Sequence, residues 1–150
     1  MIVSLHVASG GLVGALAGTR RRALALGPLA HLLGDRMPHH DLPDRRFEIA
    51  SGTLGVLALA AVRGPLDPAV LGSISAALPD AEHVLRLPRP GGKKLFPSHR
   101  FYGWHRSGGV SAGAQLVAAG FLLGALVAAG LRAQGAVGSR SSSSSPPAAT

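Results

Sequence analysis

At 150 residues the chain is long enough for one domain with a core of its own, and its length does not argue for a second. Apolar residues make up 47% and charged residues 15%, against roughly 25% charged in an average soluble domain, which favours a membrane protein. Without cysteine there is no thiolate metal site, so nitrogen and oxygen atoms must hold any metal. The net charge of +8 suits nucleic acid, anionic lipid or an anionic substrate, and does not choose among them.

The first predicted helix lies within the uncharged stretch Met1–Thr19. Gly10, Gly14 and Gly18 recur every four residues, which places them on one flat face suited to close helix contact. A signal peptide is the competing interpretation. The three arginines at 20–22 follow the apolar run and none precedes it, so we expect the helix to be retained.

Three further apolar stretches precede residue 80. The stretch Ala23–Gly34 is too short to span a bilayer, and Pro38 stops it, so it is predicted as a buried or half-inserted helix. Ile49–Val62 and Asp67–Leu78 flank a Gly-Pro turn and are predicted to form a helical hairpin.

The segment Ala81–Arg106 is polar, basic and rich in proline and glycine, and is predicted to be an exposed loop. Ser107–Leu131 then runs for 25 uncharged residues with a GxxxG pair at Gly120 and Gly124, against ~20 residues needed to cross a bilayer. The sequence therefore predicts an all-α fold: a small helical membrane bundle at 1–132 with short or half-inserted helices and one clear C-terminal transmembrane helix. The Ser/Pro/Ala-rich tail at 133–150 is predicted to be disordered.

The seven histidines lie in or beside apolar segments or at polar turns. His31 and Asp35 are four residues apart, so on a helix both leave the same face and can reach one ion. Beyond Pro38 the chain can add ligands from a turn, namely His39, His40 and Asp41. Solvated turn residues at a polar helix end explain this cluster equally well.

A second polar group follows the next apolar helix, with Asp80, Glu82 and His83 close together. Taken alone, helix capping by Asp80 is the better explanation. His99 and His105 stand before the long apolar helix, where the neighbouring aromatic residues are expected to anchor the chain at the membrane interface.

His6 shares the four-residue row of the N-terminal glycines, so it should point into the bundle if that row packs on another helix. A hydrogen-bonded core histidine is the plain alternative, but polar groups inside a membrane are costly and usually functional. The three polar junctions can lie at one membrane face if the helices alternate in direction. Imidazole with carboxylate is the ligand set of zinc, manganese or non-haem iron.

These motifs resemble the membrane-bound, LexA-regulated metal-dependent hydrolase family. The likeness rests on His6, on the run Leu78-Pro79-Asp80-Ala81-Glu82-His83, and on His99-Arg100 followed by His105 and Ser107. The resemblance implies a bacterial cytoplasmic membrane protein whose metal ligands are Asp80, His83, His99 and His105. Glu82 stands where a second Asp is usual, and the gap between His99 and His105 is one residue longer than in the family. The stretch 31–41 also looks like a His/Asp pattern of related bacterial membrane proteins.

The leading hypothesis is a membrane-embedded hydrolase of an ester or phosphoester, with zinc as the first expectation and manganese or iron as alternatives. In this hypothesis Glu82 or Asp44 is the general base, and Arg100 or Arg106 neutralises an anionic group of the substrate. The expected partners are membrane lipids, including a possible lipid or phosphoester substrate, and no nucleic acid. The alternative is a non-catalytic membrane protein whose His and Asp residues bind metal structurally or cap helices.

Overall fold

The computed structural model describes residues 1–142, with side chains up to residue 136, and this part of the chain is helical with no strand. The elements are α1 (Val3–Ala17), α2 (Arg20–Arg36), α3 (Arg45–Arg63), α4 (Pro68–Ala77), η1 (Leu78–Asp80), α5 (Ala81–Val84), η2 (Pro90–Gly92), α6 (Pro97–Arg100) and α7 (Ala112–Ser142). The all-α prediction is confirmed. Helix α7 continues past the predicted boundary at residue 132, and residues 143–150 lie outside the described part.

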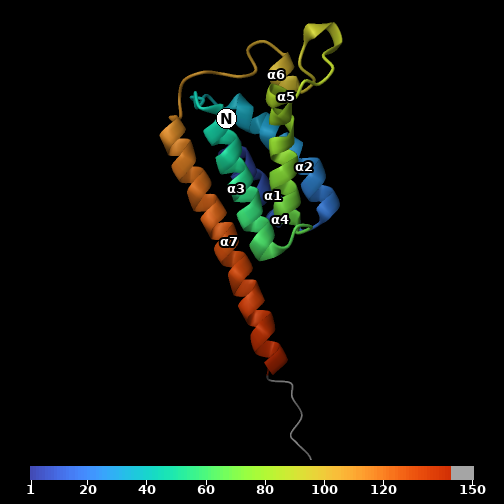
Figure 1. The fold of residues 1–150 in the computed structure, drawn as a ribbon, viewed down its shortest axis with the longest axis vertical. Coiled ribbons are helices and arrows are strands. Elements are labelled where there is room, and N and C mark those ends of the chain that lie inside the picture. Colours follow the sequence, from blue (N-terminus) through green and yellow to red (C-terminus); the bar gives the residue numbers. More distant parts are fainter. Residues whose placement is uncertain (143–150) are drawn as a thin grey trace, which may run out of the picture.

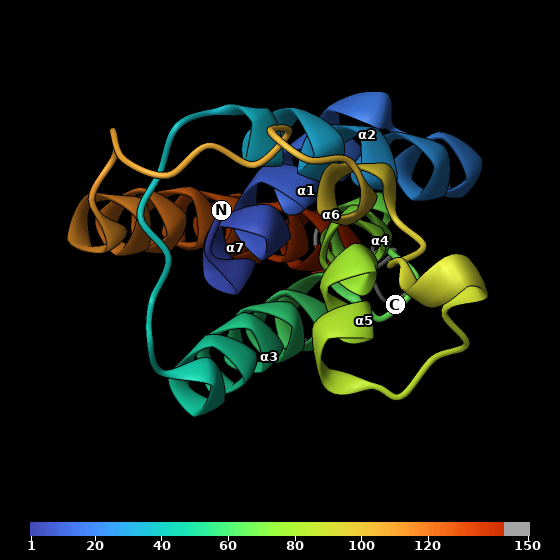
Figure 2. The same cartoon turned by 90° about the horizontal axis from the view of Figure 1, so that it is seen from above.

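Helix α1 is the centre of the bundle, and α2, α3, α4 and α7 all pack against it (Figures 1 and 2). Its glycine row makes this packing possible, because Gly10 and Gly14 lie directly against Gly72 of α4. His6 is on the same row and is fully buried. The sequence-based expectation that this row faces another helix therefore holds for Gly10 and Gly14, whereas Gly18 is the left-handed residue that ends α1.

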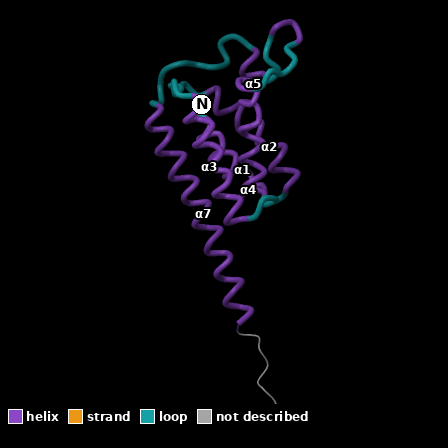
Figure 3. The backbone as a smooth tube through the Cα atoms, in the orientation of Figure 1, coloured by secondary structure: helices purple, strands orange, loops and turns teal. Residues whose placement is uncertain are grey.

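Local sequence explains where the other long helices begin and end. Thr19, Asp44 and Asp67 each cap the helix that follows, since their side chains accept backbone N–H groups of its first turn. Helix α2 ends at Arg36, ahead of Pro38, and α3 and α4 form the predicted hairpin. As a result α2 and α4 end, and α1 begins, at the same end of the bundle, where most of the connecting loops also gather (Figure 3).

Helix α7 contains the one described segment that is long and apolar enough to cross a membrane, Ala112–Ala136. Its mean hydropathy is 2.0, and only 22% of its most apolar window is buried against the rest of the chain. Several large side chains on it are open to the surroundings, among them Val117 at 74% and Phe121 at 77% exposure. This outward apolar surface suits contact with lipid.

The packing of α1 on α4 gives a first testable prediction. A Cβ atom at Gly14 would lie 2.9 Å from the carbonyl carbon of Pro68 and 3.1 Å from the Cα of Gly72, so Gly14→Val should push the two helices apart. Overpacking of this kind costs about 1–3 kcal/mol. Thermal unfolding in detergent should show the loss. Gly124→Val is the matched control, because a Cβ there meets no described atom within 4 Å, and equal destabilisation by both variants would contradict this packing.

Candidate metal centre

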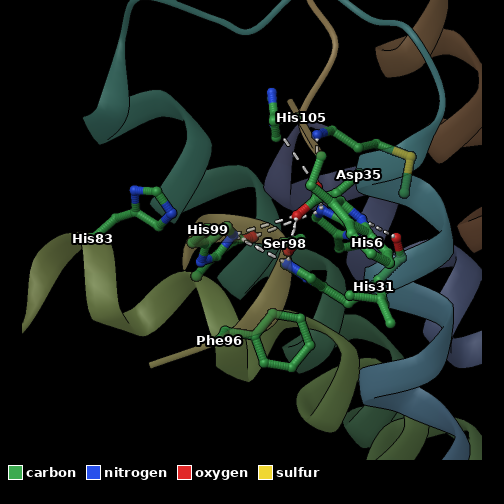
Figure 4. Close-up of polar contacts among 12 residues, drawn as sticks. His6, His31, Asp35, His83, Phe96, Ser98, His99 and His105 are labelled. Atoms are coloured by element: carbon green, nitrogen blue, oxygen red, sulfur yellow. Dashed lines mark hydrogen bonds and ion pairs between the residues drawn. The ribbon is translucent and has the colours of Figure 1, made fainter. Parts of the chain in front are cut away.

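Eight histidine and aspartate side chains meet at the end of the bundle where α1 begins and where α2 and α4 end (Figure 4). They come from distant parts of the chain and form four overlapping groups, each able to hold a metal ion. The members are His6, His31, Asp35, His39, Asp80, His83, His99 and His105. The three polar junctions of the sequence therefore share one end of the fold, as expected.

The inner set consists of His31, Asp35, Asp80 and His99. The Nε2 atoms of His31 and His99 are 3.3 Å apart. Asp35 Oδ2 lies 3.0 Å and 3.3 Å from these two nitrogens, and Asp80 Oδ1 lies 3.9 Å and 3.6 Å from them. Ligands ~2.0–2.2 Å from a tetrahedral zinc ion are separated by about 3.4 Å. The two imidazoles and either carboxylate are therefore spaced about as far apart as ligands of one zinc ion.

The protonation of the two imidazoles supports this interpretation. His31 Nδ1 lies 2.8 Å from the carbonyl oxygen of Ala76, and His99 Nδ1 lies 2.6 Å from Glu82 Oε1. Both oxygens are acceptors, so each Nδ1 carries a hydrogen, and in the neutral ring Nε2 then presents a lone pair. Two lone pairs and two carboxylate oxygens then face one another at short range, an arrangement that a cation stabilises. The donor set thus fits a divalent metal.

Electrostatics at the inner set differ between the two carboxylates. Burial alone would raise the pKa of Asp35, but the hydrogen bonds that His31, His6 and His99 donate when their Nε2 atoms carry hydrogen outweigh it and hold the pKa well below its usual range. Burial raises the pKa of Asp80 to about 6, and its Oδ2 has no hydrogen-bond partner among the described residues. One carboxylate is therefore fully engaged, whereas the other keeps an unused oxygen.

Further ligand atoms lie on the other side of Asp35. Its Oδ1 is 3.1 Å from His6 Nε2 and 3.9 Å from His105 Nε2, and the latter is 3.1 Å from His39 Nε2. The α-amino nitrogen of Met1 also lies here, in contact with His39 and 3.1 Å from Asp35 Oδ1. We call His39, His105 and Asp35 Oδ1 the outer set. His39 Nδ1 lies 2.6 Å from the carbonyl oxygen of Met37, so His39 Nε2 is suited to a cation in the same way as the inner pair.

Two predicted ligands lie at the edge of the cluster. Asp41 is exposed, and its Oδ1 is 3.2 Å from His39 Nε2. His83 is exposed, its ring centroid lies 4.3 Å from that of His99, and its Nδ1 is 2.9 Å from Lys94 Nζ. Both can reach a bound ion only from its solvent side.

The structure does not bring four of the predicted residues into the cluster. The side chains of His40, Arg100 and Arg106 are exposed. His40 and Arg106 bond to neighbouring segments through their backbone groups. Asp44 is occupied as the cap of α3, where its Oδ1 accepts the N–H groups of residues 46 and 47. Asp44 is therefore a poor candidate for a general base.

Glu82, predicted as a candidate general base, lies beside the inner set and makes several hydrogen bonds. It is buried, and besides His99 it accepts the backbone N–H of Leu95 at 2.7 Å, so it fixes the ring of His99 and the turn before α6. Burial alone would raise the pKa of Glu82, yet these hydrogen bonds lower it overall. Glu82 is a positioning residue. The segment 81–106, predicted as an exposed loop, thus contains short helices and packs part of itself against the bundle.

A prediction follows for this residue. Glu82→Gln should weaken metal binding by about 10–100-fold, because it removes the charged partner of a ligating imidazole but no ligand. Titration of metal-free protein with Zn²⁺ measures the change, and Glu82→Asp should recover part of the affinity. Unchanged affinity in Glu82→Gln would contradict the positioning role.

Sequence reasoning missed three residues near the centre. The Ser98 hydroxyl donates a hydrogen bond to Asp35 Oδ2 at 2.6 Å. Its position next to His99 in the sequence was the one feature that could have indicated a place in the site. Arg45 and Glu48, in the first turn of α3, line a cavity of about 230 Å³ that also reaches Asp35, Asp80 and His99. Nothing in their spacing distinguished these two from ordinary helix-end charges.

Comparison with known proteins found no match among protein-family models, curated proteins or solved structures. The functional argument therefore rests on the geometry of the cluster.

Proposed function

We propose that this chain is a membrane-bound metal-dependent hydrolase acting on an ester or phosphoester. The observation that carries the proposal is the close approach of the Nε2 atoms of His31 and His99, 3.3 Å apart, which converge with Asp35 and Asp80 beside a cavity. Zinc is the first candidate for this set of nitrogen and oxygen ligands, with manganese and iron as alternatives. When bound, such an ion supplies Lewis acidity and a water of pKa near ~7.

The remaining groups have roles that follow from their positions. Ser98 and Glu82 orient Asp35 and His99 through the hydrogen bonds described above. In the cavity, the guanidinium of Arg45 is placed to attract an anionic group of the substrate. The Glu48 carboxylate lines the same cavity and is the better candidate to accept a proton.

A structural metal site is the second candidate. It is favoured if Asp35 and Asp80 bind the same ion as His31 and His99, since four protein ligands complete a tetrahedral zinc shell, whereas catalytic sites usually keep one position open. The cavity favours catalysis because it gives small molecules access to Asp80 and His99. The two functions differ in one measurable property, which is turnover.

The test uses full-length protein purified in detergent. Elemental analysis should give stoichiometric divalent metal, and nitrophenyl acetate or bis-nitrophenyl phosphate should be hydrolysed. A chelator should abolish hydrolysis and added Zn²⁺ should restore it. Stoichiometric metal without turnover of either ester would support the structural site, and metal-free protein would overturn both.

For the location we propose a bacterial cytoplasmic membrane, supported by the apolar segment Ala112–Ala136 and by the family resemblance. Alkaline carbonate should leave the protein in the membrane pellet, because a spanning helix is held by hydrocarbon and not by charge. A high-salt wash of the same membranes is the control for electrostatic attachment. Release of most of the protein by carbonate would disprove the spanning helix.

A further inference from the structure

A groove lined by apolar side chains opens next to the candidate metal centre. Its volume is about 440 Å³, within the ~300–1,000 Å³ typical of ligand sites. Helix α3 forms one wall through Ile49, Thr53, Val56 and Leu57, which lie on a single helical face. Residues of α4, η1 and α5 form the opposite wall, including Ile74 and Leu78, and α1 lies between the two walls.

The groove adjoins the cavity at the metal centre. Val3, Ile49, Asp80 and Val84 line both of them. Asp80 stands at the junction: its Oδ1 faces the two imidazoles of the inner set, and its buried Oδ2 lies 4.0 Å from His6 Nε2. A molecule lying in the groove would therefore have one end at the polar centre.

The direction of the groove matches that of a lipid chain. Along α3 it extends from Ile49 to Leu57, a rise of about 12 Å at ~1.5 Å per residue. One leaflet of the hydrocarbon core is ~15 Å thick. Helix α3 packs along α7 in the bundle, so the groove runs from the metal centre in the direction of the candidate membrane span (Figure 1).

We propose that this groove binds the hydrocarbon chain of an amphiphile whose polar end lies at the candidate metal centre. The proposal deepens the hydrolase function and rests on it for the identity of the polar end as an ester or phosphoester. The adjoining cavity is lined by Arg45 beside four carboxylates, so Arg45 together with a bound divalent cation would favour an anionic end. A lipid satisfies both halves of the site, whereas an apolar helix of a partner protein would leave Asp80 and its neighbours facing hydrocarbon.

The test locates the bound hydrocarbon chain directly by photolabelling. Dodecylphosphonate with a diazirine near the end of its chain is photolysed with the metal-loaded protein in detergent, and the labelled peptides are identified by mass spectrometry. Labelling should fall on 49–57 and 74–85. Thr53→Trp fills the groove from α3, and Leu78→Trp fills it from the opposite side. Each should reduce labelling at least about tenfold, which corresponds to the free energy of burying two methylene groups of the hydrocarbon chain.

Both substituted side chains are exposed, so the variants should fold; Leu78, for example, is 64% exposed. Leu54→Trp is the matched control, because Leu54 is 66% exposed on α3 but does not line the groove. Labelling spread over the outer faces of α2 and α7, or unchanged in both groove variants, would overturn the proposal. Metal content measured on the same samples distinguishes the lipid-binding groove from the hydrolase function. Labelling confined to the groove in a protein that carries no metal would support the groove as a hydrocarbon-chain site and reject the hydrolase.

Discussion

Asp35→Asn is expected to remove bound metal and to reduce hydrolysis by at least ~1,000-fold. Asp35 is the carboxylate shared by both ligand sets, with Oδ2 facing His31 and His99 and Oδ1 facing His105. Asparagine has nearly the same shape but is neutral and presents one oxygen in place of two. Loss of a ligand should exceed the ~10–100-fold effect expected for an outer partner.

Asp44→Asn is the matched control for this variant. Asp44 caps α3, and asparagine caps a helix about as well as aspartate, so metal content and activity should stay unchanged. The pair also tests the sequence-based assignment of Asp44 as a general base. Retention of stoichiometric metal by Asp35→Asn, or an equal loss in Asp44→Asn, would refute the centre as described.

The second large effect is expected from a graded series of histidine substitutions. His99→Ala should lose most of the metal because it removes an inner ligand, and His83→Ala should lose much less because that ring lies at the exposed edge. His40→Ala should lose none, since its side chain points to the surroundings. Each of the three changes removes an imidazole, and the three imidazoles lie at different distances from the inner set.

Elemental analysis and Zn²⁺ affinity measure this order, and circular dichroism in detergent confirms that each variant is folded. His99 lies in the short helix α6, outside the main helix packing, so its replacement should spare the bundle. Equal metal content in all three variants would show that the imidazoles do not bind metal. A loss confined to His40→Ala would place the site elsewhere.

The fold was largely predictable from the sequence, because each helix is marked locally. Uncharged stretches, the cap Asp67 and the break near Pro38 depend on neighbouring residues only. The C-terminal end of α7 was harder to predict, since the sequence directly after residue 132 gives no strong signal that ends a helix. The short helices between 81 and 106 were missed because proline and glycine there indicate turns, whereas these helices are held in place by packing on the bundle.

The candidate centre was predictable in its residue types but not in its geometry. Spacing alone joined His31 to Asp35, and the glycine row placed His6 inside the bundle. The exclusion of His40 and the capping role of Asp44 depend on side-chain direction in three dimensions, which a linear pattern does not contain. The same is true of Glu82, whose role follows from its distance to His99 Nδ1 and from the backbone N–H groups it accepts.

The inner set also joins segments that are far apart along the chain. His31 and His99 are separated by 68 positions, and the intervening chain includes both helices of the hairpin. An ion held between them would act as a cross-link that closes this long loop, and the entropy it removes from the unfolded chain grows with loop length. The site is complete only after α6 has been synthesised and docked. Metal capture would therefore be among the last events of folding, and would make the dissociation of α6 from the bundle depend on the free metal concentration.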